Sequence, residues 1–262
     1  MVSTALPGPW RAHATDDELR RQFIETDFDD RAWLPVTVPG HWAHQERLAS
    51  RRSVLYRTTF TLADDPNNDQ GRHWLVFDGI WASADVWLDG AYLGPTDGWF
   101  TPHEFDITDQ IRSSPDSTHI LSVEVMSQRP SVDEPTRSLN GIFDDPDIVG
   151  HQNRGGIWQP VRVVSTGPVR MAKNRVVCTE ASSTSAKLHL RSHLLTEEQQ
   201  SVTITTTLRP PGGAPPIVSS REHELASGST VLEWDLNIAD PQLWWPWQLG
   251  EQPLSGSPSA SK

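Results

Sequence analysis

The sequence predicts an all-β fold made of β-sandwiches, and three observations support this prediction. From Val54 onward, short segments carry apolar residues at every second position, which is the period of a half-buried strand. These segments return roughly every ten residues, with turn-forming residues between them. Only one helix is expected, near the N-terminus, and repeated short strands with so little helix are typical of sandwiches. The 262 residues are enough for two domains of ordinary size.

The expected helix begins at residues 15–18, Thr-Asp-Asp-Glu. This spacing matches a capping box, in which the Thr15 hydroxyl and the Glu18 carboxylate each accept a hydrogen bond from a backbone N–H at the helix start. Leu19 and Phe23 then form a short apolar face. The helical pattern ends after this segment.

The first clear strand is expected at residues 54–62. Tyr56, Thr58 and Phe60 share one face with Leu62, and the alternate residues occupy the other face. The segment is rich in β-branched and aromatic residues, so it reads as a half-buried strand.

A β-hairpin is expected at Asp89-Gly90, between apolar alternations at 84–88 and 91–94. Both central residues of a type I′ turn need positive φ, and Asp-Gly provides them. Further extended segments are expected at 36–40, 74–77, 104–107, 119–126, 157–164, 169–177, 187–195, 201–208 and 230–236.

A domain boundary is expected at the turn Thr166-Gly167-Pro168, after which Trp is absent until Trp234 and Ser and Thr become frequent. The first domain would then span 1–167 and the second 168–254, followed by a disordered tail at 255–262. The longest irregular segment, 128–154, is expected to be functional or disordered, because compact domains seldom hold such long loops.

Charge and composition exclude several functions. A net charge of −12 and a pI near 5.2 disfavour nucleic acid and anionic membranes as partners. Residues 1–20 hold no apolar stretch behind a basic patch, so we expect a cytoplasmic protein. The single Cys178 has no cysteine partner, and His41 and His44 lack a third ligand. His189 and His193 lie too far apart along one strand face to bind one ion together, so we expect neither a metal nor a cofactor.

Four segments carry motifs whose order and spacing span most of the chain. They are Trp33 to Trp42, which includes Val38-Pro39-Gly40; Phe77-Asp78-Gly79-Ile80-Trp81 through Val86-Trp87-Leu88-Asp89-Gly90 to Phe105-Asp106-Ile107-Thr108; Gly155-Gly156-Ile157-Trp158-Gln159-Pro160-Val161; and Asp240-Pro241-Gln242-Leu243-Trp244-Trp245-Pro246. Together they resemble the N-terminal half of glycoside hydrolase family 2, the family of β-galactosidases, β-glucuronidases and β-mannosidases. The resemblance implies a jelly-roll, galactose-binding-like sugar-binding domain followed by an incomplete immunoglobulin-like sandwich.

In this family a third region, a (β/α)8 barrel, carries two catalytic glutamates. Such a barrel takes about 250 residues, and sandwich strands already occupy most of this chain. Neighbouring carboxylates such as Glu197-Glu198 point to opposite faces of a strand, so they cannot converge on one substrate. We therefore expect no catalytic residue here and no turnover by the chain alone.

The function expected from the resemblance is that of the non-catalytic N-terminal part of an enzyme acting on β-linked sugars. A stand-alone carbohydrate-binding module and an inert truncated fragment are the alternatives. The expected partners are a carbohydrate and a catalytic barrel domain encoded elsewhere.

The tryptophans divide by sequence context. Trp74, Trp87 and Trp158 lie within strand alternations and are expected in the core. Trp81 and Trp99 adjoin glycines or turn residues, so packing and contact with a sugar ring are equally favoured for them. If the second sandwich lacks strands, some of the tryptophan rings in residues 244–247 are expected to be exposed.

The segment 128–154 provides the remaining site candidates. By resemblance, loops of the first domain reach the active site and touch the terminal sugar. Arg137, Asp147, His151 and Arg154 are the candidates for binding sugar hydroxyl groups, and a solvated loop is the alternative. The galactosidase branch has an acidic residue a few positions before its Gly-Ile-aromatic motif. This chain has Gly150 there, with Asp147 as the nearest carboxylate.

Overall fold

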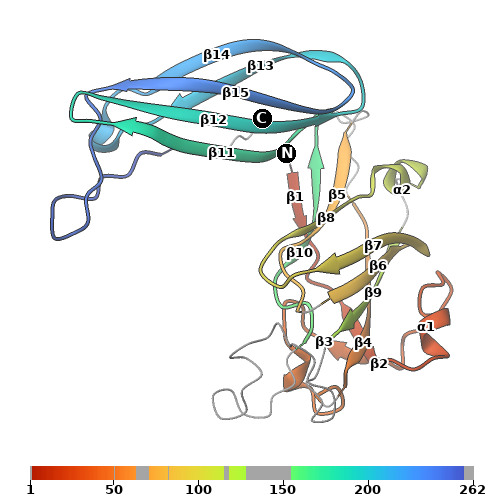
Figure 1. Ribbon diagram of the computed structural model, residues 1–262. Helices are drawn as coiled ribbons and strands as arrows, with labels where there is room; N and C mark the ends of the chain where they lie inside the picture. Colours follow the sequence, from red (N-terminus) through yellow and green to blue (C-terminus); the bar gives the residue numbers. More distant parts are fainter. Residues whose placement is uncertain are drawn as a thin grey trace. The chain divides into compact units, whose positions relative to one another are not determined.

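The computed structural model describes residues 2–49, 51–62, 71–81, 83–114, 118–127 and 155–256. The chain divides into two compact units, Val2–Ser165 and Thr166–Lys262, called here the first and second units. Strands dominate both units (Figure 1), which confirms the predicted all-β fold. The predicted boundary at Gly167 and the predicted domain end at Leu254 stay predictions. No helix among the described residues has the length and apolar character needed to cross a membrane.

The first unit contains two sheets. The larger has the order β3-β2-β4-β9-β6-β7, and all its neighbouring strands are antiparallel. Its strands are β2 (Trp10–Ala14), β3 (Leu34–Val36), β4 (Ser53–Phe60), β6 (Ser83–Leu88), β7 (Ala91–Asp97) and β9 (His119–Met126). The smaller has the order β1-β10-β5-β8, from β1 (Val2–Ala5), β5 (Arg72–Phe77), β8 (His103–Asp106) and β10 (Val161–Thr166).

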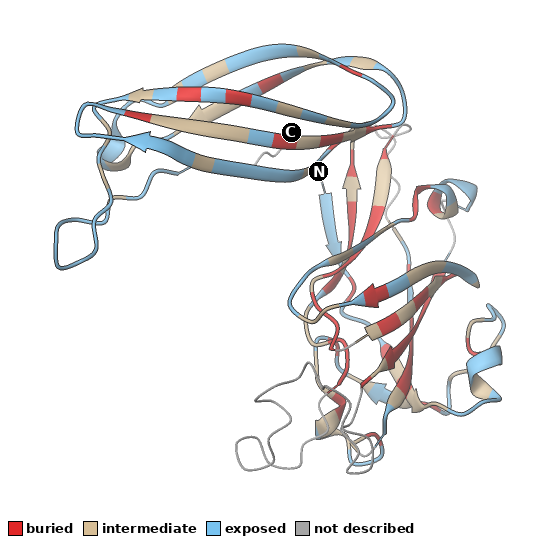
Figure 2. Ribbon diagram, in the orientation of Figure 1, coloured by how far each residue is buried: buried red, intermediate tan, exposed pale blue. Residues whose placement is uncertain are grey.

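Residues from both sheets form one core. Tyr56 and Val123 of the larger sheet belong to the same buried cluster as Leu75, Phe77 and Val163 of the smaller sheet. Burial therefore follows the strands of both sheets (Figure 2). Two sheets that share an inner core make a β-sandwich, as the sequence predicts.

Strand β4 is buried on both faces, whereas the sequence predicts one buried face. Tyr56 lies in the main core, but Leu55 on the opposite face lies in a second cluster with Phe23 and Trp33. The prediction was wrong because residues 19–33 cover the outer face of the larger sheet. Period two alone cannot show that a distant segment covers a strand.

The helix α1 is shorter than expected and starts differently, since it spans only Leu19–Gln22. Thr15 does not cap it, because its hydroxyl oxygen lies 2.7 Å from that of Ser53. Asp16 Oδ1 instead accepts from the N–H groups of Glu18 (3.0 Å) and Leu19 (2.8 Å). The predicted capping box was therefore wrong, because the carboxylate one residue later takes the free N–H groups.

The predicted hairpin is confirmed. Asp89 (φ 50°) and Gly90 (φ 81°) connect β6 to β7 with positive φ at both positions. The Asp89 carboxylate also accepts from the backbone N–H of Ile120 at 2.7 Å, which ties the turn to β9. The structure adds the helix α2 (Thr108–Ser113) and a short 3₁₀ turn, η1 (Trp42–His44), which the sequence pattern did not predict.

The second unit contains a three-stranded sheet, β11-β12-β15, and a two-stranded sheet, β13-β14, both antiparallel. Its buried cluster consists of Leu194, Ile204, Leu225 and Trp234. Strand β14 was not predicted, because charged and polar residues fill its sequence. The strands are β11 (Val169–Ala181), β12 (Ser185–Thr196), β13 (Gln200–Leu208), β14 (Ile217–Leu225) and β15 (Gly228–Ala239), and a 3₁₀ turn, η3, spans Pro211–Gly213.

Candidate functional site

Three of the motif segments meet in the first unit, starting with residues 155–157. The N–H of Gly40 donates to the carbonyl of Ile157 with an N···O distance of 2.8 Å, and the N–H of Trp42 donates to the carbonyl of Gly155 at 3.0 Å. The Pro-Gly turn after β3 is thereby joined to a segment more than a hundred residues later in the chain.

Each of the two adjacent glycines in this segment is required for a different physical reason. A Cβ at Gly155 would overlap the ring of Trp42, so only hydrogen fits there. Gly156 has a φ of 121°, which L side chains rarely adopt, and a Cβ there would lie 2.8 Å from the carbonyl oxygen of Gly40. This backbone also explains why β10 begins at Val161 rather than at residue 157 as expected: residues 155–160 form the crossing point instead of a ladder.

The segment 78–81 joins the same crossing point. The N–H of Trp81 donates to the carbonyl of Gly156 at 2.9 Å, and the N–H of Asp78 donates to the carbonyl of Pro160 at 3.0 Å. The Asp78 carboxylate accepts two hydrogen bonds from Arg162, at 2.9 and 3.1 Å. Hydrogen bonding to Asp78 raises the pKa of the Arg162 guanidinium, and the two charge-assisted hydrogen bonds hold the segment in place.

Five rings gather beside this crossing point, and we call them the aromatic cluster: His41, Trp81, Trp99, Phe100 and Trp158. Trp81 and Trp99 are stacked, with ring centroids 4.9 Å apart and an interplanar angle of 17°. His41 is stacked parallel to Trp158 at 6.4 Å. The Trp158 indole N–H donates to the carbonyl of Trp99 at 3.0 Å, which fixes the two residues relative to each other.

The rings of the aromatic cluster lie in two layers. Trp81 is only 4 % exposed and lies against Trp99, which is half-buried, so Trp81 supports the ring above it. Phe100 is 63 % exposed and packs edge-on against Trp158 at 5.6 Å. An exposed aromatic face with a packed layer behind it can accept a flat, partly apolar ligand without losing side-chain entropy.

A buried tyrosine lies beside the crossing point. Tyr56 is buried beneath Gly156, and this burial raises the pKa of its phenol, so the phenol stays protonated. In the part of the chain that the structure describes, no three His, Cys, Asp or Glu side chains converge as metal ligands. The described rings of the cluster thus provide an aromatic surface.

The structure brings together two of the six predicted site residues, Trp81 and Trp99. The other four, which are Arg137, Asp147, His151 and Arg154, lie outside the described residues. The sequence reasoning missed three members of the cluster. The sequence pattern assigns His41 to no site, predicts Trp158 in the core although it is half-buried, and gives Phe100 no role.

A signal for two of the missed residues was present. His41 follows the Pro-Gly turn and Trp158 belongs to the Gly-Gly-Ile-Trp motif, so both lie in segments that the resemblance had already identified. Phe100 had no such signal beyond its position next to Trp99.

The sequence is similar to a family model and to several known proteins. Residues 42–155 match the family model described as "Glycosyl hydrolase 2 galactose-binding domain-like". The chain is 22 % identical to a beta-galactosidase of Photobacterium profundum, over 92 % of this chain and 24 % of that protein. It is 27 % identical to an exo-beta-D-glucosaminidase of Hypocrea virens, over 76 % of this chain and 22 % of the other. The chain thus spans less than a quarter of the length of these relatives.

Solved structures show the same fold at low sequence identity. A beta-glucuronidase of Bacteroides uniformis superposes with a TM-score of 0.76 and 20 % identity, covering 93 % of this chain and 28 % of that protein. A structure described as a putative beta-galactosidase from Bacteroides fragilis superposes with a TM-score of 0.71 and 18 % identity, covering 93 % of this chain and 36 % of that one.

Proposed function

Since residues 42–155 are a galactose-binding-like domain of glycoside hydrolase family 2, we propose that this chain is the non-catalytic, carbohydrate-contacting part of a β-glycosidase. The aromatic cluster is the observation that supports this proposal most directly. It lies where three of the family-like segments meet, and it combines an exposed ring, Phe100, with a stacked pair of indoles.

The contact with a sugar follows from the chemistry of the two surfaces. A pyranose ring has an apolar face of C–H groups, which packs against aromatic rings, and a rim of hydroxyl groups, which needs polar partners. Trp99 and Phe100 provide the aromatic surface in our proposal. Arg137, Asp147, His151 and Arg154 precede Gly155 in sequence, and we propose that they bind the hydroxyl groups.

Catalysis is assigned to residues outside this sequence. A retaining glycosidase needs two carboxylates about 5 Å apart on either side of the scissile bond, whereas the aromatic cluster contains no carboxylate. We propose that a barrel domain carries that pair and that the complete enzyme acts on a β-linked sugar. The cytoplasm stays the proposed location.

A hydrolysis panel tests the catalytic part of the proposal. The purified chain is incubated with chromogenic β-galactoside, β-glucuronide, β-mannoside and β-glucosaminide, and the released chromophore is measured. We expect no release above a protein-free blank. Hydrolysis that persists after repurification and scales with protein concentration would overturn the assignment of catalysis to another domain.

A binding assay on the same chain tests the contact surface. The methyl glycosides of these four sugars are titrated by calorimetry into the wild type and into Phe100→Ala and Trp99→Ala. Trp247→Ala is the matched control, because it removes an exposed aromatic ring from the second unit. We expect weak binding of one sugar that both cluster variants abolish and the control retains. Binding that survives both cluster variants contradicts the proposed surface.

The second candidate function is a stand-alone carbohydrate-binding module, which the 63 % exposure of Phe100 favours. The same titration separates the candidates. A module binds its sugar with useful affinity by itself, with a Kd of about 1 mM or lower. A contact domain that needs the barrel binds more weakly than this until the barrel is supplied.

A further inference from the structure

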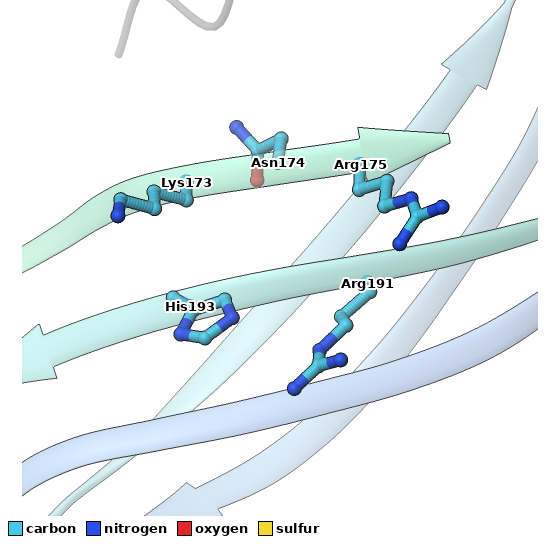
Figure 3. A pocket seen from close by; sticks show the side chains of 5 residues that line it. All are labelled: Lys173, Asn174, Arg175, Arg191 and His193. Carbon is cyan, nitrogen blue, oxygen red and sulfur yellow. The ribbon is translucent and has the colours of Figure 1, made fainter. Parts of the chain in front are cut away.

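A basic hollow lies on the outer face of the three-stranded sheet in the second unit. Figure 3 shows Lys173, Asn174 and Arg175 on β11 and Arg191 and His193 on β12. These residues line a hollow with a volume of about 570 Å³. Lys173 is paired with His193 and Arg175 with Arg191 in the antiparallel register. Directly paired residues point to the same face of a sheet, so four basic side chains share this surface.

The rest of the same face shows how such charges are normally balanced. Lys187 Nζ lies 3.0 Å from a carboxylate oxygen of Asp235, and His189 Nδ1 lies 2.9 Å from the other. Two hydrogen bonds lower the pKa of Asp235, and the one from His189 contributes more than the one from Lys187. Arg191 Nε lies 3.3 Å from Glu233. Strand β15 thus supplies acidic partners for the central strand.

Within the described part of the chain, three of the four basic side chains in the hollow have no such acidic partner. Among the described residues, no carboxylate lies within ion-pair distance of Lys173, Arg175 or His193. Lys173 and Arg175 are exposed, and like charges on neighbouring strand positions repel each other. An anion in the hollow would relieve this repulsion. This local excess of positive charge contrasts with the net charge of −12 on the whole chain.

We propose that this hollow binds the oxyanion group of a small ligand, which is a phosphate monoester, a sulfate monoester or a carboxylate. Guanidinium groups bind oxyanions through paired N–H donors, and the Lys173 ammonium adds a point charge. The hollow has a volume of about 570 Å³, which leaves room for the organic part of a small ligand beside its oxyanion group. The net negative charge of the chain repels polyanions at long range. A small anion is therefore favoured over a polyanion, because its binding depends on short-range contacts in the hollow. This inference is independent of the proposed sugar contact in the first unit.

The test uses the full chain and three probes: inorganic phosphate, glucose 6-phosphate and glucose. Binding is followed by the backbone amide resonances of residues 173–175 and 191–193. We expect saturable shifts with both phosphates, with Kd values of about 1 mM or lower, and none with glucose. Dextran sulfate is added as a fourth probe. If only dextran sulfate binds, the ligand is a polyanion and the small-ligand proposal is overturned.

Matched variants assign the effect to the hollow. Arg175→Gln should weaken phosphate binding about tenfold, because it removes a charged hydrogen-bond donor. Arg221→Gln is the control, because Arg221 is an exposed arginine of β14 on the other sheet and its loss changes the net charge equally. Glu233→Gln should strengthen binding, since it frees Arg191. Equal weakening by Arg175→Gln and Arg221→Gln would show a general charge effect and overturn the proposal, as would the absence of phosphate binding by the wild type.

Discussion

In the first unit Trp10 and Trp42 are each 1 % exposed, whereas in the second unit Trp244, Trp245 and Trp247 are 57 %, 47 % and 78 % exposed. The sequence predicts that some of these last rings are exposed, and the structure confirms it. In the second unit Trp234 belongs to the core, but these three tryptophans lie on the surface. The difference shows that the packing available around a tryptophan, and not the residue type alone, decides whether its ring is buried.

The cause is the size of the two cores. The main core of the first unit draws on both sheets, and a second cluster around Phe23 covers the outside of β4. The core of the second unit rests on Leu194, Ile204, Leu225 and Trp234. Hydrophobic stabilisation is roughly proportional to buried apolar area. We therefore expect the first unit to be more resistant to unfolding than the second.

The largest expected effect compares a buried with an exposed tryptophan. Trp10→Ala should lower the free energy of unfolding of the first unit by about 3–5 kcal/mol, because it leaves a cavity and removes the indole N–H that donates to the carbonyl of Leu6. Trp247→Ala should change stability by less than about 0.5 kcal/mol. Hydrogen exchange of amides in each unit measures both effects. Equal losses would contradict the contrast between the two cores.

The next effect compares charged groups. The Arg57 side chain is 3 % exposed, and its guanidinium donates to Asp30 at 3.1 Å and to the carbonyls of Phe23 and Glu25. Burial lowers the pKa of Arg57 from its usual value, but the group stays charged. Arg57→Ala should destabilise the first unit by about 3 kcal/mol, because it removes the donor from several buried acceptors.

The control for Arg57 lies in the second unit. Lys187 is also ion-paired, but on an exposed face, where water and salt screen the interaction. Lys187→Ala should therefore leave the hydrogen-exchange protection of β12 unchanged. A loss of protection there as large as that caused by Arg57→Ala would show that burial is not the deciding factor.

A smaller effect compares two glycines. Gly155→Ala should destabilise the first unit by about 1–3 kcal/mol, because the new methyl group forces the ring of Trp42 to move. Gly167 has nothing within 4 Å of a Cβ position and no positive φ, so Gly167→Ala should be neutral or slightly stabilising. Urea unfolding followed by tryptophan fluorescence measures both variants. If Gly155→Ala is as stable as the wild type, the crossing point is more adaptable than its geometry indicates.

The fold was largely predictable because it depends on local patterns. Period-two alternation located β4, β9 and β12, and Asp89-Gly90 located a hairpin. The predictions that were wrong concern features that depend on residues distant in the sequence. The outer face of β4 is buried because residues 19–33 return over it, and no local window of the sequence contains that information.

The candidate site was only partly predictable for the same reason. Trp81 and Trp99 were singled out by their flanking turns, and the structure stacks them. Their different exposures follow from the crossing of segments 38–42, 78–81 and 155–160, which are far apart in the sequence. His41 and Trp158 become neighbours only through that crossing.

The smallest expected effect is a difference in acid sensitivity. In the first unit, burial raises the pKa of Asp106, but hydrogen bonds from Thr108 and Arg72 outweigh it, so the net pKa lies below its usual value. A carboxylate whose pKa is depressed by folding stabilises the protein above its unfolded pKa, which is about 3.9. That stability is lost as the pH falls through the folded-state pKa. The first unit should therefore lose stability progressively below about pH 4.

The matched pair for this effect is Asp106→Asn and Asp235→Asn. Asp106→Asn should flatten the loss of first-unit stability below about pH 4, because the titrating group is gone. Asp235 in the second unit also has a lowered pKa, caused first by His189 and then by Lys187, but it lies on an exposed face. Solvent and salt screen that interaction, so Asp235→Asn should flatten the acid profile of the second unit less. Urea unfolding at several pH values measures both slopes. A larger change for Asp235→Asn would mean that exposed pairs, rather than half-buried ones, set the acid stability of this chain.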